Sequence, residues 1–113
     1  MALTITKLFQ PQQLLATDGV LYSMPATPAT TTLKNGRVRL TNTTSGAVTA
    51  TLYAAPSAAA SGAGNCFLNA VSIAGNGYLD VDLPTMAAGD TLRGLASSAA
   101  SITIHEMGGV LYS

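Results

Sequence analysis

The chain has 113 residues, a formal net charge of zero and charged side chains at only 9% of its positions. Because an average soluble domain carries about 25% charged residues, charge contributes little to the solubility of this surface. The sequence pI of about 6.5 lacks the basic excess that is typical of nucleic-acid-binding proteins. We therefore expect a single domain over residues 1–113 that binds no nucleic acid and whose surface is partly covered by partner chains.

The first ten residues, MALTITKLFQ, lack the pattern of a signal peptide, because their only charge, Lys7, lies inside the apolar segment instead of before it. No apolar run approaches the roughly 20 residues that a membrane-spanning helix needs. We therefore expect a protein that is synthesised in the cytoplasm and has no membrane partner.

Short strands separated by turn residues are predicted from the N-terminal third onward. Residues 3–9 (LTITKLF) alternate between apolar and polar side chains, and residues 19–25 (GVLYSMP) form a short strand that Pro25 ends. Residues 55–65 are rich in alanine, but Pro56 and two glycines predict a flexible loop there instead of a helix.

The clearest hairpin is expected around the polar turn at residues 41–46, TNTTSG. Residues 37–40 (RVRL) alternate before this turn, and residues 47–54 (AVTATLYA) alternate after it. This is the pattern of two half-buried antiparallel strands joined by a short loop.

A second hairpin is expected from residues 66–74, through Gly-Asn-Gly at 75–77, to residues 78–83. In its second strand the apolar residues face one side, and Asp80 and Asp82 face the other. Both carboxylates are therefore predicted on one solvated face.

The last predicted strands are residues 91–97, in which Gly94 marks a bulge, and residues 101–107, whose isoleucines face inward and whose His105 faces outward. About seven to nine short strands in all predict an all-β fold. We expect an antiparallel β-sandwich, jelly-roll-like or immunoglobulin-like (Ig-like), with a core of Leu, Val, Ile and Ala.

The pentapeptide GVLYS occurs at residues 19–23 and again at residues 109–113. Because the flanking residues differ, we interpret the identity as one strand pattern used twice, with Val and Tyr on one face and Leu on the other. An end as apolar as Val110, Leu111 and Tyr112 is unfavourable in water, so the second copy is expected to complete a sheet, in its own chain or in a neighbour.

Catalytic and metal-binding patterns are weak in this sequence. It has one histidine, His105, and one cysteine, Cys66, and no nucleophile-elbow motif surrounds any serine. Cys66 lies in an apolar run and is expected to be a buried small side chain. Asp80 and Asp82 offer far fewer than the six to eight oxygens that calcium prefers. We predict no enzyme activity, no cofactor and no metal site.

The only charge cluster is basic and contains Lys34, Arg37 and Arg39, of which the two arginines share a strand face. One interpretation is an edge strand whose charges block unwanted pairing. The other is an intermolecular contact with carboxylates of a partner chain, for which Asp80 and Asp82 are the obvious complement.

The segment RVRLTNTTSGAVTATLY, together with the earlier VLYSMPA and the later AAGDTLRGLASSAASITI, resembles a family of small virion structural proteins of tailed bacteriophages. In that family an LY-x-x-P-A segment precedes an L-T-N-x-T, x-A-V-T-x-T-L-Y hairpin, and a GDTL-x-x-x-AS strand pair precedes a V/I-T-I strand. The opening MALTITKLFQPQQL also matches. The resemblance implies a β-sandwich without catalytic residues that assembles on the virion, often as a trimer or a higher ring.

From this resemblance we expect a capsid decoration (cement) protein that stabilises the head by bridging coat subunits, with itself and the major capsid protein as partners. The alternatives are a structural protein of the neck, tail or fibre base, and a small module that binds host glycans. The candidate assembly contacts are Arg37, Arg39, Asp80, Asp82, Val110, Leu111 and Tyr112.

Overall fold

The computed structural model describes residues 3–4, 7–56 and 59–112. Within these ranges the chain forms ten strands and one short 3₁₀ turn, η1 (Ala63–Asn65), and it contains no α-helix and no helix able to cross a membrane. The strands are β1 (Leu3–Thr4), β2 (Gln12–Gln13), β3 (Gly19–Ser23), β4 (Thr32–Asn42), β5 (Val48–Ala55), β6 (Cys66–Ile73), β7 (Tyr78–Asp82), β8 (Met86–Ala87), β9 (Thr91–Ala96) and β10 (Ile102–Tyr112).

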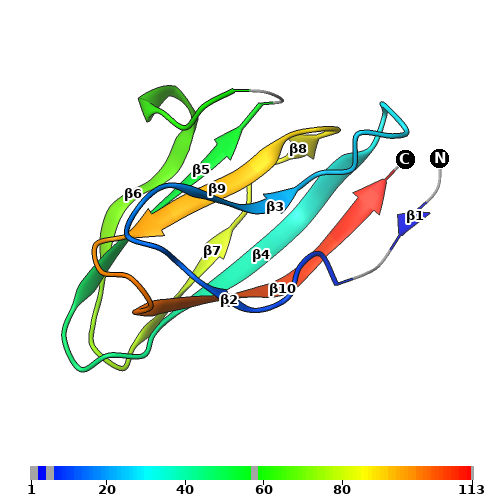
Figure 1. Cartoon of the computed structure of the whole chain (residues 1–113). Helices are drawn as coiled ribbons and strands as arrows, with labels where there is room; N and C mark the ends of the chain where they lie inside the picture. Colours follow the sequence, from blue (N-terminus) through cyan, green and yellow to red (C-terminus); the bar gives the residue numbers. More distant parts are fainter. Residues whose placement is uncertain (1–2, 5–6, 57–58, 113) are drawn as a thin grey trace.

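These strands form two antiparallel sheets that lie in two layers (Figure 1). The six-stranded sheet has the order β1-β10-β4-β7, with β2 also paired to β10 and β8 also paired to β4. The four-stranded sheet has the order β3-β9-β5-β6. The all-β prediction is therefore confirmed, but the strands are more numerous than expected, and β4 and β10 are each 11 residues long.

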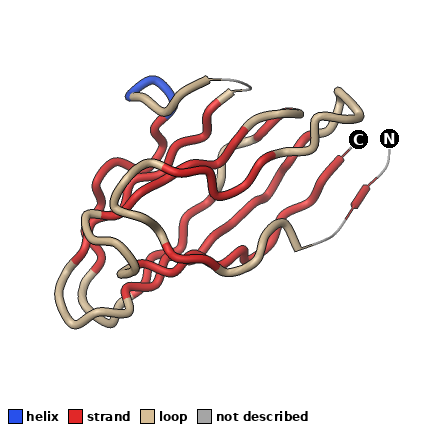
Figure 2. The backbone as a smooth tube through the Cα atoms, viewed as in Figure 1, coloured by secondary structure: helices blue, strands red, loops and turns tan. Residues whose placement is uncertain are grey.

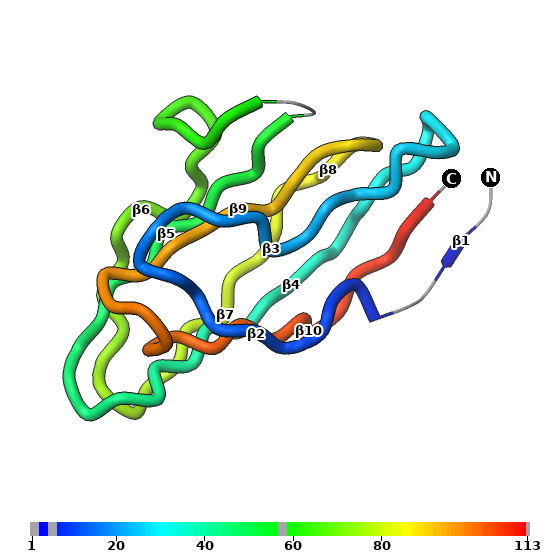
Figure 3. Tube along the Cα trace, viewed as in Figure 1, coloured from blue at the N-terminus to red at the C-terminus, as the bar shows by residue number. Residues whose placement is uncertain are grey.

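The chain passes from one sheet to the other at most of its connections (Figure 3). β4 is followed by β5 in the opposite sheet, and β6 is followed by β7 in the opposite sheet, so both predicted hairpins are wrong. The polar turns do reverse the chain at the expected places. Alternating side chains cannot decide whether the two flanking strands pair side by side or face each other across the core, because both arrangements bury one face.

The core lies between the two sheets, whose strands are red in Figure 2, and is built from side chains on the inward faces of both sheets. The predicted composition is confirmed, with two methionines added. The alternation of inward and outward residues is also confirmed in residues 36–42 of β4, in β9 and in the first part of β10. In β5 it is wrong at Thr51, which is buried together with Ala50 and Leu52. The cluster consists of Leu14, Met24, Leu33, Val38, Leu40, Val48, Ala50, Leu52, Ile73, Leu83, Met86, Leu92, Ala96, Ile102 and Ile104.

The side chain of Asn42 links the two sheets at one end of the molecule. Its buried carboxamide nitrogen donates to the carbonyl oxygens of Gly46 at 2.8 Å and Ile73 at 3.0 Å. Its side-chain oxygen accepts from the backbone N–H of Thr44 at 2.9 Å and from the hydroxyl of Thr44 at 2.7 Å. The side-chain amide of Asn42 thus uses both its donor nitrogen and its acceptor oxygen in hydrogen bonds. These bonds join the end of β4 to the end of β6, which belongs to the other sheet.

Two bulges interrupt the pairing of β4 with β10. The register runs from Glu106↔Val38 to Gly108↔Arg37, which leaves Met107 as an extra residue on β10, and resumes at Val110↔Lys34. Over the second interval the extra residue is on β4, where Asn35 has a φ of 57°. Because each strand contributes one extra residue, the two bulges cancel and the pairing beyond them returns to its original phase.

The second copy of GVLYS completes the six-stranded sheet within its own chain. Leu111 pairs with Leu33 of β4 on one side and with Thr4 of β1 on the other. One of the two expected outcomes for this chain end is thereby confirmed over the described residues, which extend to Tyr112.

Candidate interaction surface

The outer face of the six-stranded sheet carries the charged side chains that the sequence singled out. Val38 and Leu40 point into the core, so Arg37 and Arg39 point away from it. The register places Arg37 opposite Asp82 and Arg39 opposite Asp80 on the neighbouring strand β7. We call this surface, which also includes Lys34, Tyr78, His105, Val110 and Tyr112, the outer face.

Arg39 and Asp80 form a closed pair. The Nε of Arg39 donates to Oδ1 of Asp80 at 2.7 Å, and Nη2 donates to Oδ2 at 3.0 Å. The guanidinium carbon also lies 4.3 Å from the centre of the Tyr78 ring, a cation–π arrangement. These hydrogen bonds, with the attraction between the charges, lower the pKa of Asp80 and raise that of Arg39.

Arg37 and Asp82 form an open pair. Within the described residues, one side-chain hydrogen bond joins this pair, from Nε of Arg37 to Oδ1 of Asp82 at 2.9 Å. The two side chains are 56% and 77% exposed, compared with 37% and 33% for Arg39 and Asp80. The terminal guanidinium nitrogens of Arg37 therefore remain available to a further acceptor.

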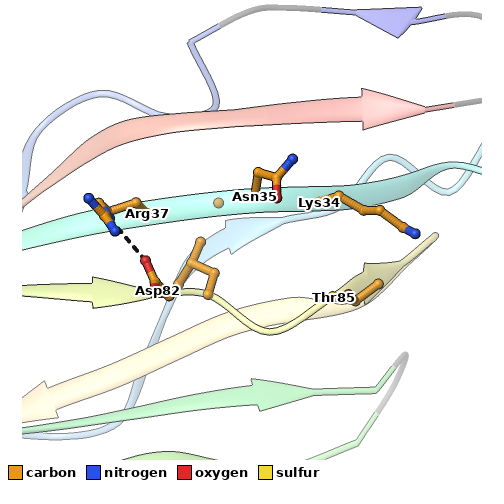
Figure 4. A pocket seen from close by; sticks show the side chains of 7 residues that line it. Lys34, Asn35, Arg37, Asp82 and Thr85 are labelled. Carbon is orange, nitrogen blue, oxygen red and sulfur yellow. Dashed lines mark hydrogen bonds and ion pairs between the residues drawn. The ribbon is translucent and has the colours of Figure 1, made fainter.

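A hollow of about 470 Å³ opens beside the open pair (Figure 4). Lys34, Asn35 and Arg37 follow one another along β4, and Asp82 and Thr85 lie on the facing segment. A second hollow, of about 410 Å³, lies beside it and is lined by Thr30, Thr32, Lys34 and Tyr112. Lys34 lines both hollows.

The bulge at Asn35 explains why Lys34 shares a face with Arg37. Residues three apart on a regular strand point to opposite faces. Here Leu33 and Gly36 are buried, whereas Lys34 and Arg37 are both exposed, because Asn35 adds one residue between them. Asparagine tolerates this left-handed conformation better than most residues.

The structure corrects one interpretation of the basic cluster and changes the other. β4 lies between β10 and β7, so Arg37 and Arg39 do not guard an edge strand, and that prediction is wrong. Asp80 and Asp82 are indeed the complement of the arginines, but the pairing is made within one chain. Non-local pairing of β4 with β7 brings the four side chains together, which no local pattern specifies.

The remaining candidate contacts divide between the two sides of β10. Val110 and Tyr112 lie on the outer face, opposite Lys34 and Thr32, whereas Leu111 packs against the core. The role of these residues in assembly stays a prediction.

The two side chains considered for catalysis lie in different sheets. His105 is exposed on β10, as predicted, and Cys66 begins β6 in the four-stranded sheet. Cys66 is only partly buried, so the prediction of a buried side chain is wrong; β6 is an edge strand and its first residue has no strand beyond it. No group of three or more potential metal-ligating side chains occurs among the described residues.

Glu106 is the acidic residue on the inward face of β10, since it pairs with Val38. Near the rim of the core it faces Tyr22, whose ring centre lies 5.8 Å from that of Phe9. Burial of the Tyr22 side chain raises the pKa of its hydroxyl, and the negative charge of Glu106 raises it further.

Lys34 is the site residue whose position sequence reasoning missed. The Asn35-Gly36 dipeptide is a signal that could have found it, because Asn-Gly marks a turn or a local irregularity in an otherwise alternating strand. With a bulge at that dipeptide, the alternation on its two sides would have placed Lys34 and Arg37 on one face.

Comparison of the chain with protein-family models, with characterised proteins and with solved structures finds no match. The class of protein is therefore inferred from the strand order, from the geometry of the outer face and from the sequence resemblance alone.

Proposed function

We propose that this chain is a jelly-roll β-sandwich and a structural protein of a bacteriophage virion, most specifically a capsid decoration (cement) protein. The single observation that carries the proposal is the strand order. One sheet reads β1-β10-β4-β7 and the other β3-β9-β5-β6, with most connections passing between the sheets. This is the order expected of a double-sheet jelly roll, an architecture common among viral capsid and lectin domains.

The chemistry of the outer face supports a structural role. Its two carboxylates are matched by two arginines of the same chain, so the face can pack against a partner without burying the unpaired charge of either aspartate. The zero net charge of the whole chain removes long-range repulsion between copies. Both features suit a protein present in many neighbouring copies.

The mechanism that we propose is mechanical. Each copy bridges neighbouring coat subunits and adds interface area, with a trimer or a higher ring as the assembling unit. A C3 or larger ring requires a heterologous contact, in which two different surfaces of the chain meet. The outer face and the opposite side of the four-stranded sheet are the two broad surfaces available in this two-layer fold.

Cryo-electron microscopy of the virion tests the proposal. We expect a density of about 45 × 26 × 17 Å per copy, placed over contacts between coat subunits on the head. Density found only at the neck, tail or fibre base would replace decoration by the alternative placement. A purified protein whose mass in solution is that of a monomer, and which does not bind to heads lacking it, would refute assembly on the capsid.

A glycan-binding module is the second candidate, because Tyr78 is 62% exposed on the outer face and jelly rolls also occur in lectins. Against it, the guanidinium of Arg39 covers one face of the Tyr78 ring, which is the surface that a sugar would stack on. A glycan array with reproducible binding that Tyr78→Ala abolishes would favour the module over the virion protein.

A further inference from the structure

The free edges of the two sheets differ in how they are protected. An edge strand presents unpaired backbone N–H and C=O groups, and proteins normally blunt it with charged side chains, prolines, bulges or a covering segment. The edge strand β7 carries Asp80 and Asp82, and Pro84 follows it closely. The edge strand β3 is covered near its middle, because the side-chain nitrogen of Gln12 donates to the carbonyl oxygen of Leu21 at 2.8 Å. Both edges are therefore poor templates for a further strand.

β6 is the edge strand with the weakest protection. Among the described strands that end the two sheets it is the longest, with eight residues compared with five in β3 and five in β7. Its sequence, CFLNAVSI, contains neither a charged residue nor a proline. Its pairing with β5 shifts twice between residues 66 and 71 and is regular over residues 71–73. Figure 1 shows β6 at the outer side of the four-stranded layer, so its regular, uncharged end is open to another strand.

The backbone of Ser72 points toward this free edge. Ser72 lies opposite Thr49 of β5. The N–H of Thr49 donates to Oγ of Ser97 at 3.1 Å, and the C=O of Thr49 accepts from the N–H of Ser97 at 2.9 Å, so both groups are used on the side of β9. Residues that lie opposite each other in an antiparallel pair exchange either both backbone hydrogen bonds or neither. The N–H and C=O of Ser72 are therefore directed away from β5, and its side chain is exposed.

The chemistry of β6 favours a second copy of the same chain as its partner. An identical strand laid against β6 brings no like charges together, and the zero net charge of the chain removes long-range repulsion. The inward side chains of β6 are also incompletely covered. Phe67 and Leu68 pack against the core but are only partly buried, and Val71 is partly buried too. A second sandwich beside this edge would cover them further.

We propose that β6 of one copy pairs with β6 of a second copy, antiparallel and about a two-fold axis near Ser72, so that two four-stranded sheets become one continuous sheet. Such a contact is isologous and closes on itself, because each copy uses the same edge. It leaves both broad surfaces of the fold free for the contacts within a ring. The inference thus deepens the proposed function, and it rests on that function for the place of the contact, between neighbouring rings on the virion.

Sedimentation equilibrium of the full chain tests the contact. Because one strand edge buries less surface than a standard interface, we expect weak association, with a mass that rises between about 10 μM and about 1 mM protein. Ser72→Lys should raise the Kd about tenfold, because two lysines then meet near the axis and like charges destabilise a strand pair. Ser72 is exposed, so the variant should keep its fold, which its melting temperature verifies.

Ser23→Lys is the matched control, because Ser23 is an exposed serine on β3, the other edge strand of the same sheet. It should change the Kd by less than about twofold, within the usual effect of a surface substitution. The inference is overturned if the wild-type chain does not associate at about 1 mM, if Ser72→Lys associates as well as the wild type, or if Ser23→Lys weakens association equally.

Hydrogen exchange of the ¹⁵N-labelled chain tests whether strand pairing makes the contact. The amide of Ser72 should exchange more slowly as the protein concentration rises, because it gains an acceptor only in the dimer. The amide of Thr49, which already donates to Ser97, is the internal control. Association without slower exchange at Ser72 would overturn strand pairing. Slower exchange at Ser72 only after purified coat subunits are added would overturn the second copy as the partner.

Two outcomes separate this inference from the proposed function. Virions that incorporate the Ser72→Lys variant at normal occupancy would refute the contact between rings and leave the decoration role intact. Self-association that meets every expectation above, in a protein that is absent from virions, would refute the proposed function and leave the β6 contact standing.

Discussion

The two copies of GVLYS have the same five residues and different surroundings. The first copy is β3, an edge strand of the four-stranded sheet. Its pairing with β9 shifts between Val20 and Tyr22, so that Leu21 is an extra residue. As a result Leu21 and Tyr22 both pack against the core, whereas Val20 is 52% exposed. The expected alternation of these side chains is therefore wrong for this copy.

The second copy ends β10, an interior strand with partners on both sides. Its pairing with β4 is regular from Val110 onward, so that Leu111 faces the core while Val110 and Tyr112 face outward, as predicted. The comparison shows that five identical residues specify a strand but not which of them are buried. A shift of one residue against the partner strand decides that.

The largest expected difference concerns the fourth residue of the pentapeptide. Tyr22 packs against the core and beside Phe9, whereas Tyr112 lies on the outer face. We expect Tyr22→Ala to cost about 2–3 kcal/mol and Tyr112→Ala less than about 1 kcal/mol in thermal or chemical unfolding. Equal costs would mean that the shift in β3 does not determine burial.

The two glycines that face each other across β3 and β9 provide a matched pair. A Cβ at Gly94 would lie 2.7 Å from a methyl group of Leu52 and 2.8 Å from the carbonyl oxygen of Thr51, whereas one at Gly19 would be 4.0 Å from its nearest neighbour, Leu15. We expect Gly94→Ala to cost about 1–3 kcal/mol and Gly19→Ala less than about 0.5 kcal/mol. Close packing thus explains why residue 94 is a glycine. The bulge that the sequence predicted at Gly94 lies instead on the opposing strand, β3.

The smallest expected effect is the response of Tyr22 to alkaline pH. Its pKa in the folded protein is raised, so its contribution to stability is complete below the unfolded value of about 10 and is lost as the pH rises through the folded pKa. Ultraviolet titration should show a late-ionising tyrosine that disappears in Tyr22→Phe. It should persist in Tyr112→Phe, the control from the second copy. Glu106→Gln should lower the late pKa, and an unchanged value would remove Glu106 as a cause.

Much of the outer face could be anticipated before the structure. Alternation placed Asp80 and Asp82 on one face and Arg37 and Arg39 on one face, and both placements are confirmed. Their partnership within one chain was not predictable, because β4 and β7 are separated by two strands of the other sheet. The position of Lys34 also escaped, since a bulge changes the phase of the pattern by one residue.

The sequence alone determined where strands occur, which residues alternate within them and where turns reverse the chain. These properties depend on the two-residue period of the strand and on local turn chemistry, both of which can be read from neighbouring residues. The tertiary structure alone decided which strands pair, that both expected hairpins divide between two sheets, and that the bulges at Asn35 and Met107 cancel. Pairing and register depend on contacts between residues far apart in the chain, and a local pattern is compatible with more than one partner strand.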